Sequence, residues 1–257
     1  MDDGAVKAVS SLIEYAANKP DATGEFEIEA RYKPAQALDR AGMNVLLARF
    51  ESNLAAFDTV TQWVETHDFF FYLHLPKSLG KGGVGKEKTE VRCTSTPDSE
   101  TLELKVENIV KTRIHSVLLT DGSCNWKLCL SKETKVPSQY IPNEAIHSHQ
   151  CRIKQRKSFI YASARSGISF RFDFTLVWQG ATKAEAETAQ RSESAEPLYE
   201  FEVEMITTHP DVETEYIAES FLAKLQDFTH CSLTVSHSSS APMRARPHAD
   251  RHAREYR

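Results

Sequence analysis

The feature that most constrains this chain is a row of glutamates spaced two residues apart, and the row occurs twice. Residues 199–205 read YEFEVEM and residues 25–31 read EFEIEAR, with an apolar residue filling each gap. In a β-strand, alternate side chains share one face and lie about 6.6 Å apart. Glutamate is depleted in strands and neighbouring like charges repel, so each row requires something positive opposite it.

Two further strand-like segments carry the matching charge. Residues 151–162, CRIKQRKSFIYA, place three cations on one face of a strand: Arg152, Lys154 and Arg156. Residues 169–178, SFRFDFTLVW, alternate aromatic or aliphatic residues with a polar set: Arg171, Asp173 and Thr175. The sequence therefore predicts acidic, basic and mixed strand faces, each backed by apolar residues.

The rest of the pattern predicts a large antiparallel sheet or barrel with helices. Helical periodicity marks residues 5–19, 35–53 and 211–228. Strand-like alternation marks the segments 58–66, 68–75, 88–95, 101–109, 111–119, 124–132, 151–162, 169–179 and 198–207. Residues 181–196, ATKAEAETAQRSESAE, are polar and low in complexity, so we expect a surface loop there.

This organisation predicts three parts of the chain. Residues 1–23 form an N-terminal helix, residues 24–230 form a barrel domain that includes a C-terminal helix, and residues 231–257 form a disordered basic tail. The N-terminus lacks the apolar core of a secretory signal, and no apolar run is long enough to span a membrane. Five cysteines without a CxxC pair predict reduced thiols in the cytosol or nucleus.

Composition restricts the partners. The net charge of −5 gives no overall nucleic-acid signature, so any basic site must be local. For any one charged strand, a solvated sheet face is the simpler interpretation. Acidic, basic and mixed rows together favour a barrel closed with its polar faces inward and its apolar faces covered by helices.

A charged lumen of this kind has a chemical consequence. Carboxylates that converge from opposite walls bind Mg²⁺ or Mn²⁺, which prefer oxygen ligands. Lysine and arginine neutralise phosphate oxygens, arginine through its planar fork. The sequence therefore predicts metal-assisted hydrolysis of a phosphoanhydride.

The order of these segments resembles the metal-dependent RNA 5′-triphosphatases of fungi, protozoa and large DNA viruses, which belong to the triphosphate tunnel metalloenzymes. The matching segments are EIEAR at 27–31, KQRKSF at 154–159, FRFDFT at 170–175 and EFEVE at 200–204. The resemblance covers about residues 24–207. It implies an α+β fold that is predominantly antiparallel β: a closed eight-stranded triphosphate tunnel with a polar lumen and helices packed outside.

The resemblance also implies roles for individual residues. The metal cluster is Glu27, Glu29 and Glu204, with Glu202 as a further member, and the metal is Mg²⁺ or Mn²⁺. The residues that bind the γ-phosphate and act in catalysis are Arg92, Lys154, Arg156 and Arg171, with Asp173 paired to Arg171 in the tunnel. Glu133 orients the attacking water. The supporting residues are Glu200, Thr175 and Arg31.

The expected reaction is removal of the γ-phosphate from 5′-triphosphate RNA, the first step of mRNA capping. A tripolyphosphatase or thiamine or nucleoside triphosphatase of the same fold is the alternative enzyme, although such relatives place the E-x-E-x-K segment at the extreme N-terminus. A non-catalytic scaffold, similar in fold to certain Mediator head subunits, is the alternative outside enzymes. Such a scaffold has no reason to retain both glutamate rows and the basic row.

The partners expected are the 5′-triphosphate end of RNA and, as competing substrates, nucleoside triphosphates. Residues 118–122 read LLTDG, with Leu119 where a guanylyltransferase requires its nucleophilic lysine, so we expect guanylyl transfer from a separate polypeptide. We expect no membrane partner and no secretion. A homodimer and a location in the nucleus, the cytoplasm or a viral replication compartment are all compatible with this composition.

Overall fold

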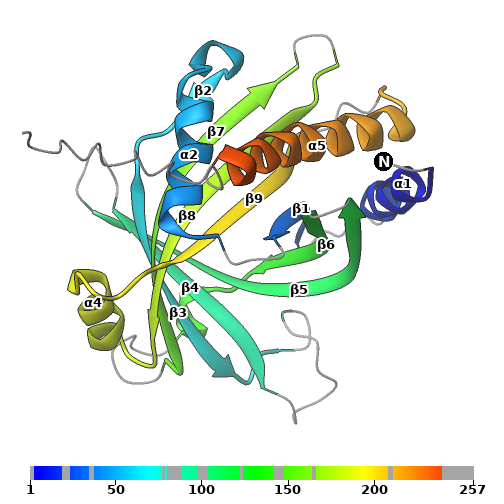
Figure 1. Cartoon of the computed structure of the whole chain (residues 1–257). Coiled ribbons are helices and arrows are strands. Elements are labelled where there is room, and N and C mark those ends of the chain that lie inside the picture. The colour runs from blue at the N-terminus through cyan, green and yellow to red at the C-terminus, as the bar shows by residue number, and fades with distance from the viewer. Residues whose placement is uncertain are drawn as a thin grey trace, which may run out of the picture.

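We describe the chain from a computed structural model. It describes residues 3–18, 24–34, 38–76, 79, 88–97, 103–121, 124–141, 148–163, 166–207 and 211–238, with side chains as far as Phe228 in the last range. One antiparallel sheet dominates the structure (Figure 1). Helices lie outside it.

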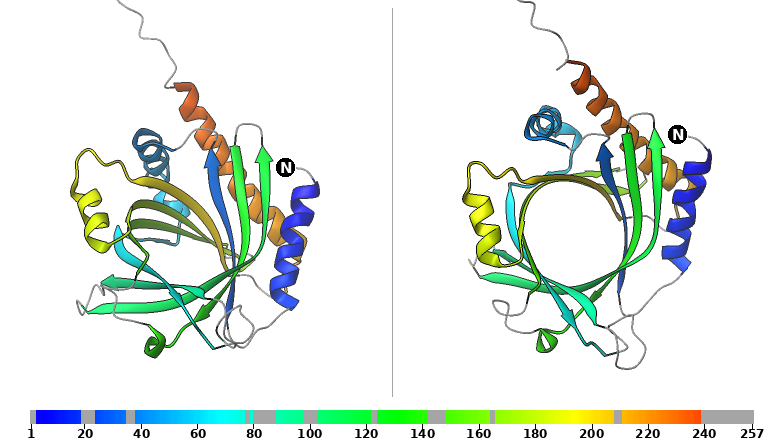
Figure 2. Two further views of the ribbon diagram at one scale, coloured as in Figure 1. Left: turned by 90° about the horizontal axis from the view of Figure 1, so that it is seen from below. Right: turned by 60° about the horizontal axis from the view of Figure 1, so that its bottom comes forward.

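The sheet closes into a barrel. Its strands are β1 (Glu25–Pro34), β2 (Thr59–Val60), β3 (Val64–Leu73), β4 (Thr89–Pro97), β5 (Leu104–Asp121), β6 (Cys124–Lys135), β7 (Gln150–Ala162), β8 (Ser169–Gly180) and β9 (Leu198–Thr207). The order is β2-β7-β3-β4-β5-β6-β1-β9-β8, and pairing of β7 with β8 completes the ring. Seen along its axis, the ring is continuous (Figure 2). The predicted closed eight-stranded barrel is confirmed, with β2 as an additional short strand beside β7.

The helices are α1 (Asp3–Asn18), α2 (Arg40–Glu51), α4 (Lys183–Arg191) and α5 (Thr214–Ser238), with short 3₁₀ turns at Leu54–Ala56 and Ser138–Tyr140. Helix α2 begins at Asp39, whose Oδ1 accepts a hydrogen bond of 2.7 Å from Gly42 N. Helix α4 begins with a reciprocal cap: Glu185 N donates to Thr182 Oγ1, and Ala181 N donates to Glu185 Oε2.

The hydrophobic core lies outside the barrel, between the strands and the helices. Helices α1 and α5 lie side by side against one wall (Figures 1 and 2). Phe50 of α2 lies within 6.3 Å, centroid to centroid, of six other phenylalanine rings: Phe57, Phe159, Phe172, Phe174, Phe201 and Phe228. Phe228 of α5 stacks on Phe201 of β9 at 3.8 Å. Aromatic residues of β7, β8 and β9 thus face outward, which leaves their charged neighbours facing inward.

A second apolar cluster lies beneath α4. Phe69 and Phe71 of β3 pack with Cys151 and Ile153 of β7 and with Ala186 of the helix. Of the cysteines whose side chains the structure describes, Cys93, Cys129 and Cys151 are buried and form no disulfide, in agreement with the predicted reduced thiols.

Several predicted boundaries were wrong. The segment 181–196 contains helix α4 rather than only a loop, because its capping pair and Ala186 dock it on the sheet. The predicted strands 101–109 and 111–119 are one strand, β5, bent by a register shift between Arg113 and His115. The predicted strands 58–66 and 68–75 divide instead into β2 and β3.

The C-terminal helix is longer than predicted, since α5 continues to Ser238. Residues 239–257 of the predicted basic tail lie outside the described residues, and the division into three parts stays a prediction. In the described part of the chain, none of the helices has the length and apolar character needed to cross a membrane.

Candidate active site

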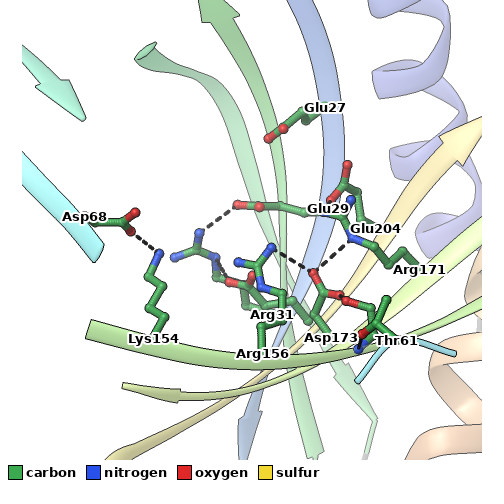
Figure 3. Close-up of polar contacts among 12 residues, drawn as sticks. Glu27, Glu29, Arg31, Thr61, Asp68, Lys154, Arg156, Arg171, Asp173 and Glu204 are labelled. Atoms are coloured by element: carbon green, nitrogen blue, oxygen red, sulfur yellow. Dashed lines mark hydrogen bonds and ion pairs between the residues drawn. The ribbon is translucent and has the colours of Figure 1, made fainter. Parts of the chain in front are cut away.

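Residues on the inner face of the barrel form one continuous charged site. The register places Glu29 of β1 opposite Glu204 of β9, and Glu204 opposite Arg171 of β8. The next row across the same strands contains Arg31, Glu202 and Asp173. Alternation along each strand therefore brings three of the predicted segments together (Figure 3).

Three glutamates gather at one end of this site. Lys111 Nζ of β5 lies 2.6 Å from Glu27 Oε2, 3.1 Å from Glu29 Oε2 and 3.4 Å from Glu133 Oε1. Burial alone would lower the pKa of Lys111, but Glu29 and Glu27 raise it above the usual value. Lys111 is therefore a fixed cation that neutralises the glutamate row of β1.

Glu204 completes the acidic end from the opposite strand. Its carboxylate accepts a hydrogen bond from Arg171 Nη2. Burial raises the pKa of Glu204 to about 7, with further increases from the charges of Glu27 and Asp173 and an opposing decrease from Arg171. The negative charge of the carboxylates around Glu204 therefore exceeds the positive charge that the neighbouring cations supply.

Arg31 joins the two glutamate rows. Its Nε lies 2.8 Å from Glu202 Oε1 and its Nη2 lies 3.1 Å from Glu29 Oε1. Burial alone would raise the pKa of Glu202, but Arg31 together with Arg156 and Lys154 lowers it. Glu202 is thus held ionised as the partner of Arg31, and it lies one row away from Glu29 and Glu204.

The basic row of β7 faces these acids across the lumen. Arg152 Nη2 lies 2.7 Å from Glu200 Oε1, Lys154 Nζ lies 2.5 Å from Asp68 Oδ2, and Arg156 Nη1 lies 3.3 Å from Asp173 Oδ2. All three cations point inward, as predicted (Figure 3 labels Lys154 and Arg156). Among the described residues, each of the three pairs with one carboxylate and has further N–H groups that can bind an anion.

Lys154 is the most buried of these cations, with 8% of its surface exposed. Burial lowers the pKa of Lys154, the nearby Asp68 opposes this, and the charges of Arg152 and Arg92 lower it further. Cations crowded in this way are stabilised by an anion placed among them.

Arg92 of β4 and Glu133 of β6 meet, although they come from distant parts of the sequence. Arg92 Nη2 donates to Glu133 Oε1 at 3.2 Å. Two buried guanidinium nitrogens, Arg92 Nε and Arg152 Nε, have no hydrogen-bond acceptor among the described residues. Buried N–H donors without an acceptor are costly, so the lumen is prepared for a ligand rich in oxygen acceptors.

Asp173 organises the cations around it. It is 2% exposed, and its carboxylate accepts hydrogen bonds from Ser158 Oγ at 2.6 Å and Arg171 Nε at 3.1 Å. It also pairs with Arg156. Thr175, two residues further along β8, is buried with no hydrogen-bond partner for its Oγ1 among the described residues. Asp173 therefore fixes two arginines of the site in one geometry.

The donor chemistry of the acidic end fits a hard divalent cation. Glu27, Glu29 and Glu204 supply carboxylate oxygens, and the buried Glu29 Oε1 pairs with Arg31 Nη2 at 3.1 Å without a well-aligned hydrogen bond from any described residue. Across the described ranges, no three aspartate, glutamate, histidine or cysteine side chains are arranged as a metal cluster. Lys111 and Arg171 pair with these carboxylates in the structure described.

The structure thus gathers every predicted site residue on the inner face: Glu27, Glu29, Arg31, Arg92, Glu133, Lys154, Arg156, Arg171, Asp173, Thr175, Glu200, Glu202 and Glu204. Their individual roles stay predictions. Sequence reasoning missed Lys111 and Asp68. Lys111 neutralises the glutamates of the acidic end, and Asp68 neutralises Lys154. A signal for Lys111 existed in the predicted strand 111–119, where alternation puts Lys111 and Arg113 on one face.

Comparisons with known proteins agree with this geometry. The profile of the family described as mRNA capping enzyme, beta chain, matches residues 51–220. No curated protein matches the chain by sequence. Many solved structures match, two of which illustrate the likeness.

The S. pombe Pct1 RNA triphosphatase matches with a TM-score of 0.53 and 13% identity, over 93% of this chain and 92% of that chain. A second structure holds the same protein in complex with the Spt5 CTD. The Mimivirus capping enzyme triphosphatase matches with a TM-score of 0.56 and 10% identity, over 90% of this chain and 97% of that chain. These likenesses show the fold, and the profile covers most of the barrel. The chain belongs to the mRNA capping enzyme beta-chain family, the mRNA triphosphatases.

Proposed function

We propose that this hydrolase removes the γ-phosphate from 5′-triphosphate RNA and that the tunnel residues described above perform the reaction. One observation carries the proposal: a basic row faces an acidic cluster inside a closed barrel, with unsatisfied guanidinium N–H groups between them. Water adds to the γ-phosphorus, the bond to the bridging oxygen breaks, and the products are phosphate and RNA with a 5′-diphosphate.

The basic row binds the triphosphate. Lys154 and Arg156 of β7 and Arg92 of β4 offer charged N–H donors from two strands on either side of β3, so an anion is contacted from more than one direction. Developing negative charge on the phosphate oxygens is stabilised by donors already in place, which lowers the barrier without reorganisation. Asp173 keeps Arg156 in position for this task.

The acidic end holds the metal. Glu27, Glu29 and Glu204 are the ligands in this proposal, with Mg²⁺ or Mn²⁺ as the ion, and Glu202 supports them through Arg31. A bound divalent ion would polarise the γ-phosphate and offset its charge. Arg171 holds the Glu204 carboxylate toward the lumen.

Glu133 positions the attacking water. Arg92 and Lys111 hold its carboxylate in place, and a carboxylate oxygen can accept a hydrogen bond from water. The proton released on attack passes to this carboxylate or to solvent. Both cations contact Oε1, so among the described residues Oε2 of Glu133 is left available to water.

The experiment measures phosphate release from γ-labelled triphosphate-ended RNA with and without Mg²⁺ or Mn²⁺, compared with ATP and tripolyphosphate. Metal-dependent release from RNA supports the proposal, and the competing substrates measure its preference. If a folded protein releases no phosphate from any substrate, the hydrolytic assignment of this tunnel is wrong.

A pair of variants tests the site assignment. Glu204→Ala should reduce metal-dependent hydrolysis at least about 100-fold, since it removes a charged group aimed at the reacting centre, while the fold persists. Glu14→Ala, an exposed position on α1, is the matched control and should keep full activity. A fully active, folded Glu204→Ala enzyme would contradict the metal assignment.

Further proposals concern partners and location. We infer that guanylyl transfer is supplied by a separate polypeptide, and a chain that becomes covalently labelled with GMP would contradict this. The Pct1 complex with the Spt5 CTD makes protein partners a reasonable expectation for this chain as well. A homodimer, and a site of action in the nucleus, the cytoplasm or a viral replication compartment, remain proposals on the sequence alone.

A further inference from the structure

An aromatic group lies on the tunnel side of β3, beyond the phosphate-binding residues. Along β3, the outward residues Phe69 and Phe71 are buried under α4, so Asp68, Phe70 and Tyr72 share the inner face. Asp68 pairs with Lys154 in the lumen, and Phe70 lies opposite Arg92 in the register. The inner face of β3 therefore changes from charged to aromatic toward the end of the strand.

The Tyr72 side chain is supported by His149 on one ring face and is otherwise largely exposed. Its ring stacks on the imidazole of His149, with centroids 4.1 Å apart and planes 14° apart. His149 is itself held by its backbone N–H, which donates to Phe70 O at 2.9 Å, and by Glu90, whose Oε2 lies 3.3 Å from Nε2. Even so, 53% of Tyr72 is exposed. One face of the ring is fixed and the remainder is available.

The Tyr72 ring is thus held in a fixed position while much of its apolar surface is exposed to solvent. A tyrosine at the end of a strand could turn toward solvent, but here it stacks on His149, whose imidazole pairs with Glu90 and whose backbone N–H is bonded to Phe70 O. Exposed, rigid aromatic faces are the groups on which single-stranded nucleic acids stack their bases. We propose that Phe70, Tyr72 and His149, which we call the aromatic rim, stack the 5′-leading nucleobases of the RNA whose triphosphate lies in the tunnel.

The spacing agrees with one continuous ligand. From Asp68 to Tyr72 is four residues of strand, about 13 Å at the usual rise. This is of the order of a triphosphate with its first ribose. Arg92, opposite Phe70, supplies positive charge between the two regions. The inference rests on the proposed function, and it assigns recognition of the polynucleotide to residues separate from those that bind phosphate.

Stacking depends on a flat ring and not on base identity, so the aromatic rim would favour RNA over tripolyphosphate without a sequence preference. Tyr72→Ala should raise KM for triphosphate-ended RNA about tenfold, the loss typical of one base–aromatic stack, while kinetics with tripolyphosphate stay as in the unmodified chain. Tyr72→Phe should restore the RNA value, because a phenyl ring stacks equally well. Tyr216→Ala, at a similarly exposed tyrosine on α5, is the control and should change neither substrate.

A binding measurement separates this inference from the proposed hydrolysis. In EDTA, triphosphate-ended RNA carrying 2-aminopurine at its first, second or third position should lose fluorescence on binding at one of these positions, and Tyr72→Ala should abolish that loss. If RNA is bound and quenched but never hydrolysed, the proposed function fails and the aromatic rim stands. If Tyr72→Ala leaves quenching and KM unchanged, or impairs tripolyphosphate equally, the aromatic rim is not a base-binding site.

Discussion

At the scale of single residues, the charge balance of the tunnel depends on Lys111. Its ammonium contacts Glu27, Glu29 and Glu133, so replacing it with methionine leaves three carboxylates without their shared cation. We expect Lys111→Met to lower the free energy of unfolding of the metal-free protein by about 1–3 kcal/mol. Denaturant unfolding in EDTA measures this.

The same variant tests the metal-binding carboxylates without an activity assay. A divalent ion that binds only the folded state raises stability, and it should do so more in Lys111→Met, where no ammonium competes. Lys7→Met, at an exposed position of α1 outside the barrel, should behave as the unmodified protein. If Mn²⁺ raises the free energy of unfolding equally in Lys111→Met and in the control, or in neither, a metal does not bind between these glutamates.

Single residues also show what sequence reasoning can and cannot reach. Alternation along β1, β7, β8 and β9 predicts which side chains share a face, because the period of a strand is fixed. It cannot predict which faces meet across the lumen. The ion pair of Lys154 with Asp68 joins residues far apart in the sequence, and only the barrel register brings them together.

At the scale of elements, helix α4 is attached to the barrel by a polar cluster as well as by Ala186. Glu65 of β3 accepts hydrogen bonds from Gln190 of α4 at 2.7 Å, from Gln155 at 3.2 Å and from His67 at 3.0 Å. Burial alone would raise the pKa of Glu65, but these hydrogen bonds lower it below 4.5.

This cluster predicts a pH dependence of stability. A carboxyl group whose pKa is lowered on folding stabilises the protein above its unfolded pKa, and the effect is lost as pH falls through the folded pKa. Glu65→Ala should therefore be less stable than the unmodified protein by about 1 kcal/mol at neutral pH, a value reduced for partial exposure. Thermal unfolding should show this difference shrinking as pH falls below 4.5.

Glu187→Ala is the matched control for this prediction. Glu187 lies on the same helix, and its ion pairs with Lys183 and Arg191 are at the surface. Exposed pairs contribute little, so this variant should stay close to the unmodified protein at every pH. A constant difference between Glu65→Ala and the unmodified protein down to acid pH would show that packing, and not the carboxylate, attaches α4.

Element boundaries were the weakest part of the sequence prediction, for identifiable reasons. The polar segment that becomes α4 has almost no apolar face, so periodicity could not reveal it, although its T-x-x-E cap was readable at residues 182–185. Strand β5 was divided at residue 110, although the chain continues as one strand through that position. Lys111 and Arg113 alternate with residues of the other face, and their side of the strand, opposite Glu133 and Ser131, lines the tunnel.

At the scale of the whole molecule, α1 covers the barrel through α5. Its buried residues Val9, Leu12 and Ile13 meet the apolar cluster that includes Ile217 and Phe221. Deleting residues 1–23 should lower the free energy of unfolding by about 5 kcal/mol or more, since each of these three buried aliphatic side chains contributes about 1.5–3 kcal/mol. Calorimetry and hydrolysis together should show a less stable protein whose tunnel is still active.

The stability of the deletion variant tests the prediction that residues 1–23 are a separate N-terminal part of the chain. Val9→Ser is a milder variant that should reduce stability in the same direction if the deletion proves insoluble. A deleted protein that cannot fold at all would mean that residues 1–23 belong to the barrel domain and are not a separate N-terminal part.

Closure of the ring by β7 and β8 also restricts how a ligand can reach the inner face of the barrel. Every strand of the ring is hydrogen-bonded on both sides, so the wall cannot open sideways without losing a whole row of backbone bonds. A ligand that binds the inner face must therefore enter through an end of the barrel. An RNA can therefore enter only by its end and as a single strand. An RNA whose 5′ end is base-paired in a helix must first open that end before its triphosphate can reach the site.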